Sequence, residues 1–411
     1  MQNSIITSPK VRFSEFSEPW FQVKLGNIGS FKNGLNKGSE DFGHGFPFIN
    51  LLDVFGKIEI DEPELKLVNA SQRDLDTYTV KKGDVFFIRS SVKRSGVGQT
   101  VVANKNLENT VYSGFLIRYR TDKDLTDSFK KYCFWTEKFR NLLVKYSTSS
   151  ANTNINQESL QNLTLSIPSA KEQQKIANFL STIDKQINLL KEKHTLLVKY
   201  KKGVIQKLFA ENSRFKDDDG TEFPDWKTER IDYFVERVSD PVDVQPDKIY
   251  REIGVRSHGK GIFHKKEIKG HELGNKRVFW VHQNAFVVNI VFAWEHAVAK
   301  TSERETGFIA SHRFPMFIPR EQRVDLRFFT IFFLSKRGKY LLGLASPGGA
   351  GRNKTLGQSN FSELKVKFPV LEEQIKIANF YEALDKKVKL AEKQIEQTQT
   401  FKKGLLQQMF V

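Results

Sequence analysis

The sequence has a single cysteine, Cys133, in 411 residues. One thiol excludes an internal disulfide framework and a cysteine-rich zinc module, and it favours a reducing compartment, so we expect the protein in the cytoplasm. Long apolar runs are also missing, since stretches such as residues 328–334 are too short to span a bilayer. Residues 1–12 are polar and interrupted by Pro9, which does not resemble a signal peptide. We therefore expect no membrane association.

Motifs for catalysis are equally scarce. An adenine methyltransferase should carry an Asn/Asp-Pro-Pro-aromatic motif to hold a flipped base, and the chain has no Pro-Pro pair. The segment 348–355 imitates a phosphate-binding loop, but Asn353 replaces the glycine that should precede the lysine. Asp247, Glu267 and Lys269 are the residue types that metal-dependent nucleases place around a divalent ion, but such triplets are common in a chain this rich in charge. The eight histidines show no metal-ligand spacing, so we expect no metal and no cofactor in this chain.

Acidic residues are outnumbered by basic ones. The 65 Lys and Arg against 48 Asp and Glu give a formal charge of +17. A strongly basic chain favours a polyanionic partner such as nucleic acid.

What the chain does contain is a duplication. Residues 167–210 return as residues 368–411 at a constant offset of 201, with about 16 identities in 44 positions and no gap. The run from Lys175 to Phe179, for example, returns as the run from Lys376 to Phe380.

Both copies have the apolar heptad pattern of a long helix that packs against another helix. Each helix should begin after a proline with an acidic first turn, and each should run about 39 residues, or roughly 58 Å. The other copy is the economical partner, and internal two-fold pseudo-symmetry would pack the two helices antiparallel. The residues expected to form this seam are apolar: Ile176, Leu180, Ile183, Ile187, Leu190, Leu197, Val204, Ile377, Leu384, Val388, Ile395 and Leu405.

The regions before the two copies are globular and repeat one order of elements. Short strand-like runs in residues 20–125 precede a helical pattern over about 128–146, and strand-like runs in 248–320 precede another over about 326–344. Trp20 and Trp226 stand near the two starts, with Arg12-Phe13 and Arg214-Phe215 before them. The polar segment 211–220 is expected to be a linker.

This arrangement resembles the specificity subunit of type I DNA restriction-modification enzymes. The resemblance covers the whole chain and is carried most specifically by Pro168 with the Glu172-Gln173 and Lys175-Ile176-Ala177 motifs, repeated from Pro369 onwards. It implies an α+β fold with two globular, β-rich target-recognition domains separated by a pair of long antiparallel, coiled-coil-like helices. The expected divisions are 1–165 and 211–367 for the recognition domains, and 166–210 and 368–411 for the spacer helices.

In that family each recognition domain reads one half of an interrupted DNA sequence, and the helices set the gap. The resemblance implies a scaffold without chemistry of its own, bound to double-stranded DNA, two modification subunits and two restriction subunits. S-adenosylmethionine, ATP and Mg would then belong to the partner subunits. The weak likeness between the two globular halves suggests an asymmetric bipartite target. The alternative is a self-contained enzyme that modifies or cleaves DNA.

Candidate DNA contacts follow from the side chains that read bases and hold phosphates. The first half offers polar and basic loops, with a solvated hairpin or a polar turn as the competing interpretation: Lys32, Asn33, Arg89, Ser90, Ser91, Lys93, Arg94, Asn152 and Asn154. The second half offers three further groups: Arg256, Ser257, His258 and Lys260; Trp294, Glu295 and His296; and Arg352, Asn353 and Lys354. For Trp294 the competing interpretation is a core tryptophan.

Overall fold

The structure is a computed structural model, and it describes residues 8–60, 65–121, 124–149, 151–210, 214–348 and 354–411. The chain divides into two compact units, which are named unit 1 (Met1–Lys191 with Lys393–Val411) and unit 2 (Glu192–Glu392). Two long helices, α7 (Ala170–Leu208) and α12 (Leu371–Gln408), belong to both units. Helix α7 begins in unit 1 and ends in unit 2, whereas α12 begins in unit 2 and ends in unit 1.

Unit 1 is built on a five-stranded sheet of order β2-β10-β6-β8-β4, accompanied by the three-stranded sheets β5-β3-β9 and β11-β12-β7 and by the pair β1-β13. Its strands are β1 (Phe21–Lys24), β2 (Ser30–Asn33), β3 (Phe42–Ile49), β4 (Glu59–Ile60), β5 (Lys66–Val68), β6 (Val85–Ile88), β7 (Ser90–Ser91), β8 (Thr100–Ala103), β9 (Val111–Tyr112), β10 (Leu116–Arg120), β11 (Thr148–Ser149), β12 (Thr153–Asn154) and β13 (Thr164–Ile167). Strands β6 and β8 are buried along their whole length, which fits their runs of Val, Phe and Ile.

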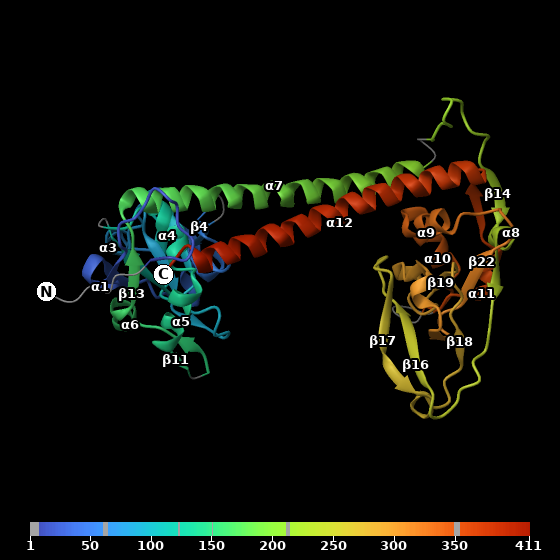
Figure 1. Cartoon of the computed structure of the whole chain (residues 1–411), viewed down its shortest axis with the longest axis horizontal. Helices are drawn as coiled ribbons and strands as arrows, with labels where there is room; N and C mark the ends of the chain where they lie inside the picture. The colour runs from blue at the N-terminus through green and yellow to red at the C-terminus, as the bar shows by residue number, and fades with distance from the viewer. Residues whose placement is uncertain (1–7, 61–64, 122–123, 150, 211–213, 349–353) are drawn as a thin grey trace. The chain divides into compact units, whose positions relative to one another are not determined.

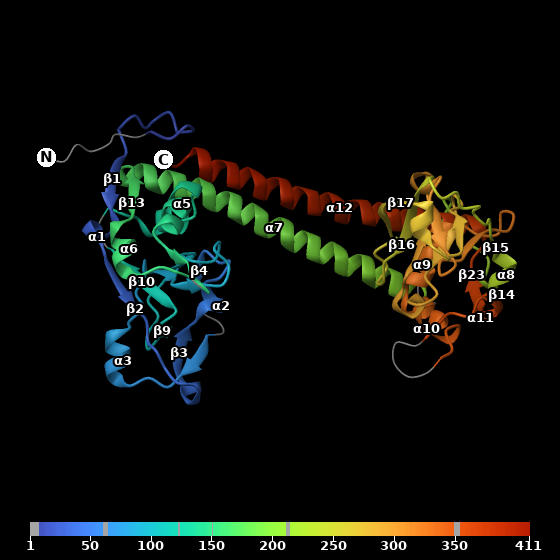
Figure 2. The same cartoon turned by 90° about the horizontal axis from the view of Figure 1, so that it is seen from below.

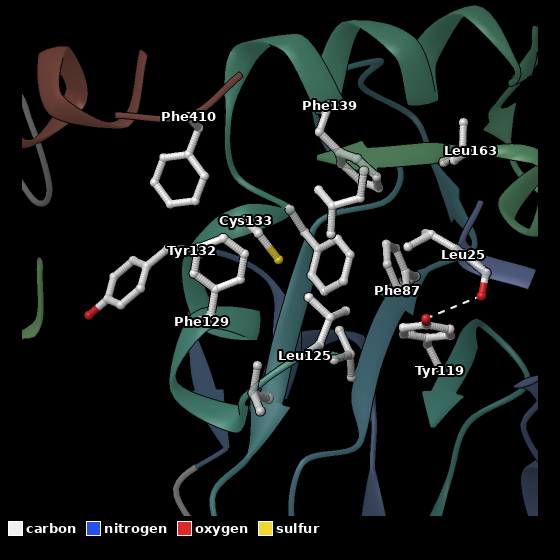
Figure 3. Close-up of a cluster of buried hydrophobic side chains, with 14 of the residues drawn as sticks. Leu25, Phe87, Tyr119, Leu125, Phe129, Tyr132, Cys133, Phe139, Leu163 and Phe410 are labelled. Atoms are coloured by element: carbon white, nitrogen blue, oxygen red, sulfur yellow. Dashed lines mark hydrogen bonds between the residues drawn. The ribbon is translucent and has the colours of Figure 1, made fainter. Parts of the chain in front are cut away.

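Helices cover this sheet. They are α1 (Leu25–Ile28), α2 (Leu51–Val54), α3 (Gln72–Thr77), α4 (Asp127–Cys133), α5 (Glu137–Lys145) and α6 (Gln157–Asn162). The main core of unit 1 joins the sheet, α4, α5 and the start of α7, and it also contains Met409 and Phe410 from the last residues of the chain. Figure 3 shows the Phe410 ring in this core close to Phe129 and Cys133.

Unit 2 contains two four-stranded sheets, of order β15-β22-β19-β20 and β17-β16-β21-β18, and the pair β14-β23. Its strands are β14 (Lys227–Arg230), β15 (Val235–Val238), β16 (Ile249–Val255), β17 (Ile262–Lys269), β18 (Val278–Trp280), β19 (Phe286–Val288), β20 (Val298–Lys300), β21 (Ile309–Ser311), β22 (Met316–Pro319) and β23 (Lys365–Phe368). Its helices are α8 (Ile231–Phe234), α9 (Leu326–Leu334), α10 (Lys336–Leu344) and α11 (Gln358–Glu363). Strands β16 and β17 run side by side as a long hairpin in both views (Figure 1, Figure 2).

The two units share a frame of equivalent elements. In unit 1, β1 pairs with β13 antiparallel, and the Leu25 N–H of α1 donates to the Leu163 carbonyl at 2.9 Å. In unit 2, β14 pairs with β23 antiparallel, and the Ile231 N–H of α8 donates to the Leu364 carbonyl at 2.9 Å. The strands β13 and β23 lead directly into α7 and α12. The sequence duplication is therefore a duplication of this frame.

The structure corrects the two shorter helical predictions. The pattern over 128–146 forms α4 and α5 rather than one helix, because the Thr136 hydroxyl accepts the Phe139 N–H at 3.3 Å and starts a new helix. The pattern over 326–344 forms α9 and α10, since the Ser335 hydroxyl accepts the Gly338 N–H at 3.1 Å. The apolar period continues through both breaks, so periodicity alone did not reveal them. Among the described residues, no helix is long and apolar enough to cross a membrane.

Candidate nucleic-acid interface

The basic candidates of unit 1 meet at one edge of its five-stranded sheet. Lys32 and Asn33 end β2, and Arg89 directly follows β6. Both strands pair antiparallel with β10 between them, so their carboxyl ends lie at the same edge. The Lys32 ammonium lies 5.4 Å from the centre of the Tyr78 ring, and the Arg89 Nη1 donates to the Gly114 carbonyl at 3.5 Å.

The polar candidates of unit 1 are joined by the small sheet β11-β12-β7. Ser90 and Ser91 form β7, and Asn154 of β12 lies opposite Ser90. The Asn154 side-chain amide donates to the Asn152 carbonyl at 3.0 Å, which fixes the turn before β12. Lys93 and Arg94 are exposed in the turn that follows β7, at 92–96. Hydroxyl, amide and cationic groups from two distant sequence segments therefore meet on one surface.

Sequence reasoning missed the residue that supports this turn. Arg140 of α5 donates from Nη2 to the carbonyls of Val97 at 2.6 Å and Ser95 at 3.0 Å. Burial of its guanidinium lowers the pKa of Arg140 to about 10. In the sequence Arg140 is one of several basic residues in a helical stretch, and no signal distinguishes it.

In unit 2 the structure brings two candidate groups together. Arg256, Ser257, His258 and Lys260 occupy the tip of the β16–β17 hairpin. The tip rests on the turn after β19, because the N–H groups of His258 and of residue 259 donate to the carbonyls of Glu295 and His296 at 2.7 and 3.0 Å. The Arg256 guanidinium lies 4.8 Å from the centre of a phenylalanine ring on β17, which holds it against the hairpin.

The Trp294 group has mixed character. Trp294 is half-buried and its indole N–H donates to the Val291 carbonyl at 3.2 Å, so this N–H is already engaged. His296 has the left-handed φ of 60°, and its Nε2 lies 3.3 Å from the Ser335 carbonyl oxygen. Burial lowers the pKa of His296, which favours the neutral imidazole at pH 7. Glu295 is half-buried beside them.

The third candidate group of unit 2 is described only in part. Arg352 and Asn353 lie outside the described residues. Lys354 is half-buried and forms an isolated antiparallel bridge with Gly348.

The residues predicted to form the helix seam are all covered to some degree. Six of them are buried: Ile176, Leu180, Ile183, Ile187, Ile377 and Leu384. The other six are half-buried: Leu190, Leu197, Val204, Val388, Ile395 and Leu405. No predicted seam position is on the exposed face of its helix.

The ends of the long helices lie in the cores of the units in which they finish. The Phe410 ring stacks on Phe129 at 5.3 Å and meets Trp20 edge-on at 6.2 Å, all within unit 1. In unit 2 the equivalent Phe209 lies 6.3 Å from Trp226 and 5.7 Å from Phe328. The two tryptophans therefore occupy equivalent places, one against each helix end.

Among the described residues, an ion pair joins the two helix segments in each unit. Lys402 pairs with Asp184 at 2.6 Å in unit 1, and the equivalent Lys201 pairs with Asp385 in unit 2. Burial opposes the charged forms, but the hydrogen bonds from Lys201 and Lys389 nevertheless lower the pKa of Asp385. Burial likewise opposes the charge of Lys201, and the Asp385 carboxylate raises the pKa of Lys201. The lysines that interrupt the apolar seam are thus satisfied by aspartates of the other copy.

The first turns of the two helices are anchored by equivalent glutamines. Gln173 accepts the Thr126 N–H at 2.9 Å and donates to the carbonyls of Asp124 and Pro168 at 2.7 and 3.0 Å. Gln374 makes the corresponding bonds in unit 2, including acceptance of the Asp325 N–H at 3.0 Å.

The preceding glutamates are paired as well. Glu172 accepts hydrogen bonds from Arg12 at 2.7 and 2.8 Å. Glu373 accepts one from Arg214 at 3.0 Å and one from the Trp226 indole at 3.1 Å. The Glu-Gln motif therefore fixes the start of each long helix to its globular unit.

The sequence matches the family described as the type I restriction modification DNA specificity domain over residues 17–198 and 265–399. The chain belongs to this family. The matched residues include most of both long helices and the helix starts that carry the Glu-Gln motif.

Relatives in the specificity-subunit family match this chain along nearly its whole length. It is 24% identical to the putative type I restriction enzyme MjaX specificity subunit of Methanocaldococcus jannaschii, over 97% of this chain and 94% of that protein. Its fold is similar to the type I restriction-modification S subunit of M. genitalium, with a TM-score of 0.53, 13% identity and coverage of 98% and 99% of the two chains. The HsdS subunit of Thermoanaerobacter tengcongensis is equally similar in fold, with a TM-score of 0.53, 13% identity and coverage of 97% and 98%.

The described residues also bear on metal binding. They include no group of three or more His, Cys, Asp or Glu side chains placed to hold a metal ion. The chemical groups gathered at the candidate surfaces are cations, hydroxyls and amides, which suit hydrogen bonding to phosphates and base edges.

Proposed function

We propose that this chain is the DNA-reading subunit of a type I restriction-modification complex, with one recognition module in each unit and an asymmetric bipartite target. The observation that supports this most is the contrast between frame and loops. The frame is equivalent in both units down to single hydrogen bonds, as at Gln173 and Gln374. The surfaces that offer cations differ, being a sheet edge with a turn in unit 1 and a hairpin tip in unit 2.

The long helices would act as the spacer between half-sites. Each is a single helix of 39 or 38 residues, and each is anchored in both units by its first turn and its last aromatic residue. A spacer fixed at both ends sets a gap in the target that loop substitutions do not change.

The proposal includes partner subunits that carry the chemistry. We propose that S-adenosylmethionine, ATP and Mg are bound by two modification and two restriction subunits, and that this chain is non-catalytic. The alternative, a self-contained DNA-modifying enzyme, is tested by adding S-adenosylmethionine and plasmid DNA to the purified chain. Methylation by the chain alone would contradict the scaffold proposal, whereas methylation only after addition of modification subunits supports it.

An exposed apolar pattern supports two equivalent docking positions. Leu189 and Leu390 are 66% and 55% exposed, and they occupy equivalent places in the two copies. Tyr200 and Phe401 form a second equivalent pair and are also exposed. Exposed large apolar side chains repeated by a duplication favour two copies of one partner, which here is the modification subunit.

The docking proposal has a matched control within the same helix. Leu189→Ser should remove one modification subunit from the complex and Leu390→Ser the other, as measured by native mass spectrometry. Leu196→Ser should not, because Leu196 is similarly exposed but its equivalent is the polar Gln397. Equal loss from all three variants would contradict the equivalent-site proposal.

The bipartite proposal is tested by the bases that each unit reads. Lys93→Ala with Arg94→Ala in unit 1 should relax or abolish recognition of one half-site, and Lys260→Ala in unit 2 should affect the other. Methylome sequencing of cells that express the reconstituted complex gives the motif directly. Unit-specific changes would support the proposal, and identical changes in both half-sites would refute it.

A further inference from the structure

Unit 2 has a pocket that the surfaces described above do not include. It has a volume of about 390 Å³ and lies between β17, the turn after β19 and the turn between β21 and β22. Two lysines, Lys265 and Lys276, line the pocket together with Asn289 and Ser311.

The pocket contains two buried polar side chains with unused donors. Asn289 is only 9% exposed, and its Oδ1 accepts the Val291 N–H at 3.1 Å. Its Nδ2 donates to no described residue, and the Ser311 hydroxyl, also nine-tenths buried, has no partner among them either. Because both side chains line the pocket, a bound group can satisfy them there. Among the described residues these two donors are unpaired but are not cut off from solvent, so they remain available to a hydrogen-bond acceptor in the pocket.

The charge around the pocket indicates an anion. Lys265 and Lys276 share one buried carboxylate, that of Glu252, at 3.4 and 3.2 Å. Two ammonium groups against one carboxylate leave a net positive charge. Arg313, which is exposed, lines the pocket too, and within the described ranges it has no ion pair with a carboxylate. The polar groups available to a ligand are therefore mainly donors.

A donor-rich, positive pocket suits a phosphate better than a base. The hydrogen-bonding edges of nucleobases combine donors with acceptors, whereas a phosphodiester presents only acceptors and a negative charge. Phe292 and Phe314 also line the pocket and can pack against the deoxyribose beside the phosphate. We propose that this pocket binds one backbone phosphate of the half-site that unit 2 reads, with Asn289, Ser311 and Arg313 as the contacting residues. This inference rests on the proposed DNA-reading function.

Such a contact would position unit 2 on the DNA. Phosphate contacts fix register and orientation, while base contacts specify sequence. A phosphate that several side chains hold in a pocket fixes the distance from the β16–β17 hairpin to the bases. A phosphate contacted by one exposed lysine or arginine is free to shift. The β17 residue Lys265 joins this pocket to the hairpin strand.

The test uses the full chain with its modification subunits and target duplexes in which one phosphate at a time is replaced by a neutral methylphosphonate. For the wild type, one position in the half-site of unit 2 should weaken binding about tenfold, as expected for loss of a charge-assisted contact. Ser311→Ala with Arg313→Gln should weaken binding to the unmodified duplex by about the same factor. In this variant, the methylphosphonate at that position should then have less than about a twofold further effect.

Two further variants make the result specific. Asn289→Asp keeps the oxygen that accepts the Val291 N–H but replaces the amide donor with a carboxylate, so it should also weaken binding to the unmodified duplex. Arg304→Gln removes an exposed cation of unit 2 outside the pocket, and the methylphosphonate penalty at the pocket position should stay at about tenfold. Removal of Arg313 should reduce the slope of log affinity against log salt by about 1.

The outcomes separate this inference from the proposed function. If methylphosphonate substitution at a position weakens binding equally in the wild type and in the pocket variants, the pocket assignment is wrong and the DNA-reading proposal still stands. Absence of sequence-specific binding by the wild-type complex would overturn both. Saturable binding of inorganic phosphate that raises the melting temperature of the wild type but not of the pocket variant, without coupling to any DNA phosphate, would overturn the assignment to DNA.

Discussion

A change at the end of the chain should destabilise the N-terminal globular unit. Phe410 is the penultimate residue, yet it is only 9% exposed and packs in the core of unit 1 against Phe129 and Trp20. We expect Phe410→Ala to loosen unit 1 and to leave unit 2 unchanged, although the whole of unit 2, residues 192–392, lies in sequence between Phe410 and the first segment of unit 1.

The magnitude follows from the packing. Replacing a buried phenylalanine with alanine costs about 3–5 kcal/mol. The low end, about 3 kcal/mol, is appropriate because Phe410 is still 9% exposed and its site can partly collapse. This corresponds to a roughly 150-fold increase in the opening equilibrium of unit 1. Phe209→Ala should act in the same way on unit 2, with a smaller cost because Phe209 is only half-buried.

Hydrogen exchange with mass spectrometry measures the two units separately. Peptides from β6 and β10 should exchange faster in Phe410→Ala, and peptides from β19 and β22 should keep their wild-type rates. Phe401→Ala is the matched control, since Phe401 is 58% exposed on the same helix and its removal should change stability by less than about 0.5 kcal/mol. Unchanged exchange in unit 1, or equal acceleration in both units, would refute the assignment of the chain end to the unit 1 core.

Three other predictions concern the frame. Lys201→Glu should destabilise unit 2 by about 1–2 kcal/mol, because it places a second carboxylate beside Asp385. The further change Asp385→Lys should restore the stability. Chemical denaturation of the single and double variants measures this rescue. The folded pKa of Asp385 is below its ordinary value of 3.8, so this aspartate stabilises the protein above that value and loses its contribution as the pH falls through the lower, folded pKa. Unit 2 should therefore keep this contribution between pH 5 and 8. In Asp385→Asn, the fall in melting temperature below about pH 4 should be smaller than in the wild type. A wild-type loss of melting temperature near pH 6 that Asp385→Asn removes would contradict the assignment. Gln173→Ala should cost about 2–3 kcal/mol in thermal or denaturant unfolding, because three hydrogen bonds of a buried side chain are lost, while the exposed neighbour Gln174→Ala should have little effect.

The long helices could be predicted from sequence because their signal is strong and repeated. The apolar heptads predicted helices of about 39 residues, and the structure has 39 and 38. The constant offset of 201 also showed that Asp184 and Lys201 recur as Asp385 and Lys402 in the second copy. What periodicity did not reveal was that the paired lysines and aspartates belong to different copies.

The candidate surfaces were predictable only as segments. The turn after β7 and the tip of the β16–β17 hairpin both proved to be exposed loops with cations. Their assembly depends on tertiary pairing, such as the contact between residue 258 and residue 295, which no local pattern encodes. The pocket lined by Asn289 and Ser311 was missed for the same reason, because its residues come from segments between 265 and 314 and none is distinctive alone.

The reciprocal contacts give a physical reason why the frame is alike in the two copies while the loops differ. Asp184 of the first copy meets Lys402 of the second, and Lys201 of the first meets Asp385 of the second. A charge exchange confined to one copy would therefore place like charges together in both units at once, and only the matching change in the other copy would repair it. The backbone hydrogen bonds of the hairpin tip at 256–261 to described residues stay within its own unit, so its side chains can change without a compensating change elsewhere in the frame. The same argument makes the loops the part of the chain in which a new DNA sequence could be read at the smallest cost in stability.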